Sequence, residues 1–387
     1  MRIAFSELMG NNKDDMNNVK KIVLTGGPCS GKTTGLNYIY EKLSNRGYSV
    51  ILVPEAATYI IGMGLQPKRY AEHDRKKYLA FQRLIFETQD VFEKNGLRAA
   101  RIKGGAKTLL LLDRGFPDIQ AYLTREEFVK LLKLKRRTLV SVRDRYDAAY
   151  HLVSAADGKV EFYTTANNKA RQETPEEAVH ADRRTQESWL GHSHLRVLDN
   201  STLFEEKMHR LEAEIMTFLG DPVPIEREYR FLLANTPDFS KFPVPYVAVE
   251  IEQAYLAGHE SREQNRIRKR TQDGDAACFQ TFKIPTSDIS ADEEREERIA
   301  TSRYYALMAH SDQDFDIIRK IRHCFLWRHQ YFELDVFTEP ERLRGRTVLE
   351  LESTMQNPNV DLPNWLGPMT DVTKNPAERN YVLARRP

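Results

Sequence analysis

The sequence is poor in cysteine and nearly neutral overall. Its 387 residues include only Cys29, Cys278 and Cys324, which are far apart and form no CxxC pair. This spacing argues against a disulfide framework or a structural zinc site, and it fits a reducing compartment, which we expect to be the cytoplasm. Because the net charge is +2, no overall field favours nucleic acid, and we expect none as a partner.

Long apolar runs and a signal peptide are also missing. No stretch approaches the ~20 apolar residues that a helix needs to cross a bilayer. Residues 1–18 become polar quickly and lack a charged-then-apolar order, so we expect a flexible leader. The length predicts two or three domains, and a cluster of proline and glycine at 220–224 favours a boundary between residues 19–220 and 221–387.

Apolar segments alternate with segments of helical spacing in the first half. Short apolar runs at 21–25, 49–53 and 109–113 predict strands, and residues 33–43 and 74–94 have helical spacing. A last strand is expected at 195–199. Strands that alternate with helices indicate a parallel sheet covered on both faces, so we predict an α/β nucleotide-binding fold here.

The segment GGPCSGKTT follows the first predicted strand and opens the first predicted helix. It fits G-x-x-x-x-G-K-[ST], the P-loop pattern, in which glycines let backbone amides surround phosphates at a helix N-terminus. Lys32 is expected to reach the β- and γ-phosphates of ATP or GTP, and Thr33 to hold Mg²⁺. The predicted nucleotide-binding residues are Gly26, Gly27, Pro28, Cys29, Ser30, Gly31, Lys32, Thr33 and Thr34.

Two carboxylates follow predicted strands nearby. Asp113 is expected to be the second metal anchor, with a helix cap as the alternative. Glu55 would hold a metal-bound water, act as a base, or only support the structure. GGPCSGKTT, VPEAA and LLDRGFPD together resemble the NadR-like P-loop ATPase/kinase family, whose Asp-Arg pair matches Asp113 and Arg114.

That resemblance implies a lid rich in arginine that closes over the phosphates. Residues 167–185 match it and contain Arg171, Arg183 and Arg184, although a solvated helix face is the alternative. A planar guanidinium is suited to stabilise the charge spread over a phosphoryl group. The predicted catalytic residues are Glu55, Asp113, Arg114, Arg171 and Arg183.

Charged side chains recur at every second position in the second half. Glu226, Glu228 and Arg230 share one face of a predicted strand, and RIRKR, FELDV and LELES repeat the alternation. Such a face is either the solvated outer side of a sheet or the interior of a barrel that binds a metal-bound polyanion. The alternation alone leaves both interpretations open.

The order of these segments, from E-x-E-x-R to DVTKNPAERNYVLA, is similar to the CYTH, or triphosphate tunnel metalloenzyme, family over most of residues 222–387. The resemblance implies an eight-stranded antiparallel barrel for triphosphate compounds or other phosphate-rich anions. Arg230 departs from it, because the opening motif usually ends in lysine. The implied metal-binding residues are Glu226, Glu228, Glu350 and Glu352, beside Thr33 and Asp113 of the first domain. The implied ligand-binding residues are Arg230, Arg266, Arg268, Lys283, Lys320, Arg322, Glu333 and Asp335.

Two further segments carry expectations. Residues 290–310 have charge at one end and an apolar stripe at the other, which predicts a helix that plugs the barrel or covers its side. Trp365 and Leu366 are expected to pack at the barrel rim, with membrane insertion as the alternative.

The combination of both domains resembles the eukaryotic family named for a photoreceptor TRPL-channel translocation defect. The resemblance implies a GTP-binding, phospholipid-responsive trafficking protein: a switch or slow NTPase whose barrel binds a phosphate-rich molecule or an anionic lipid headgroup, with peripheral membrane contact. The alternative is an enzyme, either a small-molecule kinase at the P-loop or a triphosphatase in the barrel.

Overall fold

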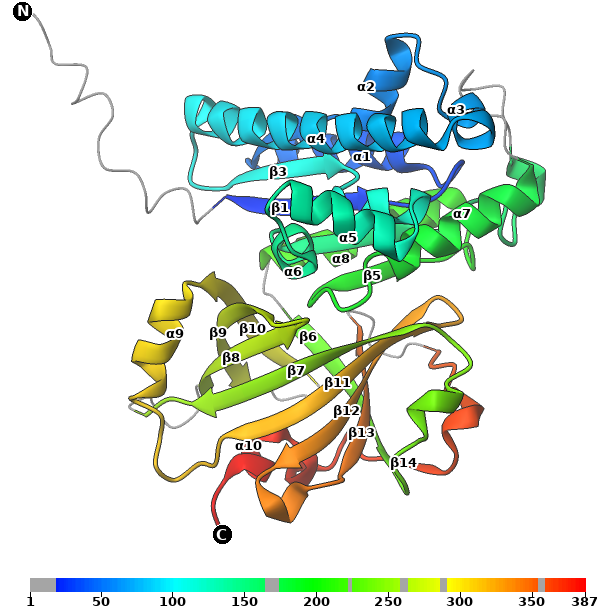
Figure 1. The fold of residues 1–387 in the computed structure, drawn as a ribbon. Coiled ribbons are helices and arrows are strands. Elements are labelled where there is room, and N and C mark those ends of the chain that lie inside the picture. Colours follow the sequence, from blue (N-terminus) through cyan, green and yellow to red (C-terminus); the bar gives the residue numbers. More distant parts are fainter. Residues whose placement is uncertain (1–18, 164–173, 222–224, 258–263, 286–290, 354–358) are drawn as a thin grey trace, which may run out of the picture. The chain divides into compact units, whose positions relative to one another are not determined.

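The computed structural model describes residues 19–163, 174–221, 225–257, 264–285, 291–353 and 359–387. The predicted leader at 1–18 lies outside the described residues. The described residues form two compact units, one from the ranges 1–135 and 145–188 and the other from the ranges 136–144 and 189–387 (Figure 1). The predicted domain boundary at 220/221 stays a prediction.

The first sheet has five strands in the order β2-β3-β1-β4-β5. Its strands are β1 (Lys20–Thr25), β2 (Ser49–Val53), β3 (Thr108–Asp113), β4 (Ala148–Leu152) and β5 (Leu195–Leu198). The pairs β2–β3, β3–β1 and β1–β4 are parallel, which confirms the predicted α/β fold. β3 and β4 are almost entirely buried, as expected for strands with helices on both faces. Sequence analysis missed β4.

Helices follow the strands of this sheet. They are α1 (Lys32–Asn45), α2 (Ala56–Gly62), α3 (Pro67–His73), α4 (Arg75–Lys103), α5 (Arg125–Leu134), α6 (Leu139–Arg143), α7 (Pro175–Glu187) and α8 (Phe204–Leu219). α4 packs on β2 and β3 through an apolar stripe that includes Phe81, Ile85 and Phe86. Because parallel strands end at one edge, β1, β2 and β3 bring Thr25, Glu55 and Asp113 to the same side of the sheet.

The second sheet is antiparallel and closes on itself. Its order is β10-β9-β8-β7-β11-β12-β13-β6-β14, and β10 also pairs with β6. Its strands are β6 (Ile225–Leu233), β7 (Tyr246–Tyr255), β8 (Gln264–Gln272), β9 (Asp275–Pro285), β10 (Ala291–Ile299), β11 (Ile318–Trp327), β12 (Gln330–Glu339), β13 (Thr347–Ser353) and β14 (Met369–Asp371). The predicted barrel is confirmed, but the sheet has nine strands rather than eight, because β14 joins β6 beyond its short junction with β10.

The predicted helix at 290–310 is wrong in its first half. Residues 292–299 pair with β9 over their whole length, and only α9 (Thr301–Met308) is helical. The ladder with β9 outweighs the helix propensity of glutamate and arginine. Tyr304 of α9 packs with Ala254, Ile267 and Cys278, so this helix covers the side of the barrel.

One large apolar cluster of this unit lies outside the barrel wall. On β12, Phe332 and Leu334 belong to an outer cluster, whereas Glu333 and Asp335 alternate with them and face inward. Leu366 is buried in the same cluster and Trp365 packs against it, which supports the packing interpretation of this segment. Among the helices of the described ranges, none has both the length and the hydropathy of a membrane span.

Candidate functional site

The P-loop pattern forms one turn between β1 and α1. Gly26 and Gly31 have φ angles of 147° and 84°, which side chains rarely adopt, and Gly31 caps α1 without a side-chain hydrogen bond. A Cβ atom on Gly26 would lie 2.3 Å from the Leu152 carbonyl oxygen. The structure therefore places all nine predicted nucleotide-binding residues at the N-terminus of one helix, where backbone amides and the helix dipole favour phosphate.

Lys32 folds back over this turn. Its Nζ donates hydrogen bonds to the carbonyl oxygens of Gly26 at 2.8 Å and Gly27 at 2.9 Å, and to Ser30 Oγ at 3.2 Å. Burial, followed by the nearby Arg114, lowers the pKa of Lys32 to about 8. The ammonium thus stays charged at neutral pH, and phosphate oxygens would replace these weaker acceptors.

Arg114 joins the predicted carboxylate Glu55 to a carboxylate that sequence analysis missed. Its Nε donates to Glu55 at 2.7 Å and its Nη1 to Asp118 at 2.9 Å. Asp118 is buried and also accepts hydrogen bonds from the Gly115 amide and the Thr25 hydroxyl. The sequence signals were the spacing of four residues between Arg114 and Asp118 and the place of Asp118 at the end of the LLDRGFPD segment.

Asp113 ends β3 beside this network. Its Oδ1 is buried and has no hydrogen-bond partner among the described residues. Burial, followed by repulsion from Glu55, raises the pKa of Asp113 to about 6. A cation would supply the missing partner of Asp113. The Thr33 side chain, at the start of α1, is exposed to solvent. The oxygens of Asp113 and Thr33 therefore fit the chemistry of a Mg²⁺ site.

Asp182 of α7 holds the turn from the other side, and sequence analysis missed it. Its Oδ1 accepts a 2.5 Å hydrogen bond from the Gly27 amide and lies 3.1 Å from His151 Nε2 on β4. Burial opposes ionisation here, yet His151 and the Gly27 amide keep the pKa of Asp182 lowered to about 2. Its neighbour Arg183 is exposed on α7, and Arg171 lies outside the described residues.

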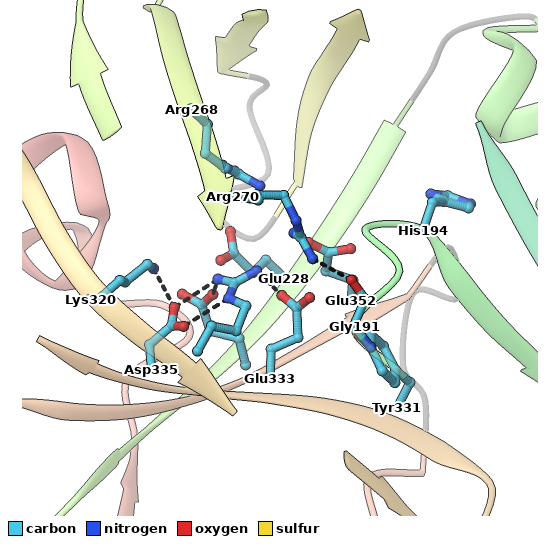
Figure 2. A network of polar contacts seen from close by, with 12 residues as sticks. Gly191, His194, Glu228, Arg268, Arg270, Lys320, Tyr331, Glu333, Asp335 and Glu352 are labelled. Carbon is cyan, nitrogen blue, oxygen red and sulfur yellow. Dashed lines mark hydrogen bonds and ion pairs between the residues drawn. The ribbon is translucent and has the colours of Figure 1, made fainter. Parts of the chain in front are cut away.

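The barrel interior forms a second candidate site. Inward-facing positions on seven of its strands carry charged side chains, nearly all of them buried or half-buried. Figure 2 shows Arg268 and Arg270 of β8 on one side of this polar network and Glu333 and Asp335 of β12 on the other. The two sequence-based interpretations are thereby resolved: this charged face lines the interior and is not the solvated outer side.

Arg322 is the centre of the buried network. Its guanidinium donates to Asp335 at 2.7 and 2.8 Å and to Glu350 at 2.7 Å, and it also binds Glu333. Lys320 donates to Asp335 as well. Although burial opposes ionisation, these cations keep the pKa of Asp335 below its ordinary value.

Arg230 and two glutamates form a neighbouring group. Its Nε lies 3.1 Å from a Glu228 oxygen and 3.4 Å from a Glu350 oxygen. Burial, followed by repulsion from Glu228, raises the pKa of Glu350 to about 8. Glu228 stays ionised because Arg230 and Lys283 outweigh its burial and keep its pKa well below the ordinary value. In the absence of a metal, a proton on Glu350 thus relieves the repulsion between the two carboxyl groups.

The β8 arginines are less well paired. Arg266 lies 3.2 Å from Glu294, but Arg268 is 3.9 Å from Glu296. The Nε atoms of Arg266 and Arg268 have no hydrogen-bond partner within the described residues. The same is true of Nε and Nη1 of Arg270. Burial and the adjacent Arg266 lower the pKa of Arg268. These unmet donors fit phosphate oxygens.

Glu294 and Glu296 are interior residues that sequence analysis missed, because their segment was predicted to be helical. Lys283 lies 2.5 Å from Glu294 and 4.0 Å from Glu228. The alternation of charge along ADEEREERI is compatible with a strand as well as with a helix, and only the ladder with β9 distinguishes them.

The predicted metal site of the barrel is described only in part. The side chain of Glu226 lies outside the described residues. Glu352 is 3.0 Å from Arg196, and within the described ranges no group of three or more His, Cys, Asp or Glu residues is spaced to hold a metal ion. The Glu228–Glu350 pair has the oxygen chemistry for a cation, and a metal there would replace the proton.

Comparison with known proteins supports the first domain most directly. Residues 21–207 match the family described as an AAA domain, a class of P-loop nucleotide-binding domain. No curated protein matches the chain. Among solved structures, the inorganic triphosphatase NE1496 is 25% identical, with a TM-score of 0.30, 41% of this chain covered and 93% of that chain covered. The PH1819 protein from Pyrococcus horikoshii OT3 is 23% identical, with a TM-score of 0.28, 34% of this chain covered and 79% of that chain covered.

Proposed function

We propose that this protein is a Mg²⁺-dependent ATP- or GTP-binding protein, a nucleotide-controlled switch or slow NTPase, whose barrel binds a phosphate-rich anion. The observation that carries the nucleotide part is the turn at residues 26–34, with Lys32 over it and a buried, unpartnered Asp113 oxygen beside it. Lys32 and the backbone amides would bind the phosphates, while Thr33 and Asp113 would hold Mg²⁺, which offsets charge on the phosphates when bound.

Arg114 and Asp182 position this site. Arg114 is tied to Glu55 and Asp118, so its guanidinium is fixed at the edge of the sheet where phosphates would bind. Asp182 fixes the Gly27 peptide and joins α7 to the turn. Arg183 lies on this anchored helix, which supports its proposed role in an arginine lid.

The barrel part rests on the buried arginines with unmet donors. Seven cationic side chains (Arg230, Arg266, Arg268, Arg270, Lys283, Lys320 and Arg322) face its interior. A phosphate-rich molecule or an anionic lipid headgroup would present the same oxygens to them. The proposed resemblances, NadR-like for the first domain and CYTH-like for residues 221–387 in the TRPL translocation defect arrangement, favour a cytoplasmic protein with peripheral membrane contact.

The alternative is an enzyme. Asp113, with its raised pKa, is suited to accept a proton from an acceptor hydroxyl, which would favour a small-molecule kinase. A triphosphatase in the barrel is less favoured, because Arg230 binds two glutamates and a guanidinium stays protonated near neutral pH, so it cannot act as a base.

The test is binding and turnover of ATP, GTP and inorganic triphosphate with Mg²⁺. We expect wild type to bind a nucleoside triphosphate and Lys32→Ala to bind it much more weakly. Turnover that survives Lys32→Ala but is lost in Glu350→Ala would favour the triphosphatase instead. No detectable nucleotide binding by wild type would refute the proposal.

A further inference from the structure

Residues 189–194 reach into the polar interior of the barrel, although they precede β6 in the chain. Arg270 Nη2 donates a 2.8 Å hydrogen bond to the Gly191 carbonyl oxygen (Figure 2). The Gly191 amide donates to Tyr331 Oη at 3.2 Å, and Tyr331 Oη donates to the His192 carbonyl oxygen at 3.1 Å. Three hydrogen bonds thus hold this turn against the inward-facing side chains of β8 and β12.

The turn is tightly packed where it meets the barrel. Gly191 has a φ of 84°, and a Cβ atom there would lie 2.5 Å from Arg143 Nη1 and 3.1 Å from Val247 Cγ1. Arg143 Nη1 also donates to the Leu190 carbonyl oxygen at 3.1 Å. The position therefore requires glycine, and the carbonyl group of Gly191 is fixed toward Arg270.

The opposite end of the charged interior is apolar. Along β12 the inward-facing residues are Tyr331, Glu333, Asp335 and Phe337. Phe337 packs with Ile318, Val348 and Ala384 of α10 (Asn380–Ala384). The six residue steps from Tyr331 to Phe337 span roughly 20 Å of strand, or roughly 15 Å along the axis of a barrel with strands tilted by 35–45°. The charged interior is therefore short and bounded at both ends.

The unmet donors lie next to the Gly191 turn. Nε of Arg268, and Nε and Nη1 of Arg270, are the buried guanidinium nitrogens there without a hydrogen-bond partner among the described residues. They can bind a phosphate group, but the Gly191 carbonyl oxygen beyond them is an acceptor and repels phosphate oxygens. A phosphate chain can therefore end at Arg270 and cannot continue past Gly191.

We propose that residues 189–194 are a stop that limits the barrel ligand to a short phosphate chain, such as a triphosphate group, and excludes long linear polyphosphate. Gly191 and Tyr331 are then specificity-determining residues. The inference rests on the proposed function of the barrel as a phosphate-binding site.

The experiment compares inorganic triphosphate with long-chain inorganic polyphosphate by titration calorimetry. The full chain carries Lys32→Ala, so that the P-loop does not contribute, and only binding that is weakened by adding Arg268→Gln is assigned to the barrel. We expect this protein to prefer triphosphate by about tenfold per molecule. Tyr331→Phe removes both hydrogen bonds between the turn and β12 and leaves those from Arg270 and Arg143. It should reduce the preference to about twofold by strengthening polyphosphate binding.

Tyr255→Phe is the matched control, because Tyr255 is a buried inward-facing tyrosine in the apolar cluster at the opposite end. It should leave the preference unchanged. Gly191→Ala is a second variant, which displaces the turn through the backbone, and circular dichroism verifies that each variant folds.

Equal binding of both anions, or a preference that neither Tyr331→Phe nor Gly191→Ala changes, would overturn the inference while the phosphate-binding function stands. If no anion binds in an Arg268-dependent way, the proposed function of the barrel fails, and this inference fails with it.

Discussion

The two candidate sites differ in how they manage charge without a ligand. At the P-loop turn one lysine is bound only to neutral acceptors among the described residues, and a buried carboxylate oxygen nearby has no partner there. The barrel interior pairs most of its cations with its own carboxylates, and Arg322 alone binds three of them. One site is prepared for a ligand, whereas the other must break internal ion pairs to accept one.

This difference has an energetic meaning. A phosphate group at the P-loop replaces weak neutral acceptors of Lys32, so the exchange favours binding. In the barrel, each phosphate oxygen competes with a carboxylate that already neutralises its arginine. The β8 arginines are the exception, because several of their donors are unmet, and the ligand is therefore expected to bind there first.

The largest expected effect tests the buried ion pairs around Arg322 inside the barrel. Arg322→Met leaves Glu333, Asp335 and Glu350 without their shared cation, and we expect it to lower the free energy of unfolding of the barrel by about 3–5 kcal/mol. Urea unfolding at neutral pH measures this.

Arg319→Met on the same strand is the matched control for that variant. Arg319 pairs with Glu252 and Glu339 at a half-exposed site, so its loss should cost about 1 kcal/mol or less. Similar losses for the two variants would show that the interior pairs are no more important to stability than surface pairs.

The next largest effect concerns the P-loop site. Lys32→Ala should weaken Mg²⁺–nucleotide binding by about 100-fold, because a charge-assisted contact to the phosphates is lost. The unfolding of the barrel should not change. Lys42→Ala, in the last turn of the same helix, is the control and should bind nucleotide normally. Calorimetric titration with ATP and GTP measures both variants.

Asp182→Asn tests whether the hydrogen bond from the Gly27 amide to Asp182 stabilises the P-loop turn. The pKa of Asp182 is lowered to about 2 in the folded protein, so its carboxylate contributes stability above about pH 4, and this is lost as the pH falls toward 2. We expect about 2 kcal/mol from a shift of this size. The variant should lack this acid-dependent loss and should bind nucleotide more weakly. An unchanged acid-denaturation profile would contradict the assignment.

The smallest expected effect separates binding from stability inside the barrel. Arg268 has only a 3.9 Å contact with Glu296, and its pKa is lowered by burial and by Arg266. Arg268→Gln should therefore weaken triphosphate binding by about tenfold and leave the free energy of unfolding unchanged or higher. A less stable variant with normal anion affinity would assign Arg268 to the structure instead of the ligand.

Much of the first site was predictable because its chemistry is local in the sequence. The glycine spacing, Lys32 and Thr33 lie within nine residues, and the strand before them and the helix after them are both formed. Asp118, His151 and Asp182 were missed. They reach the site from the segment after β3, from β4 and from α7, respectively. Such contacts depend on the sheet order, which no local pattern contains.

The alternation of charge along the later strands was determined by the sequence, since side chains two residues apart share a face of a strand. The sequence did not determine whether that face was solvated or enclosed. Closure of the sheet through β10 and β6, with apolar clusters packed outside the wall, decided this. The same closure made 291–299 a strand, since its pairing partners on β9 and β6 exist only in the folded barrel.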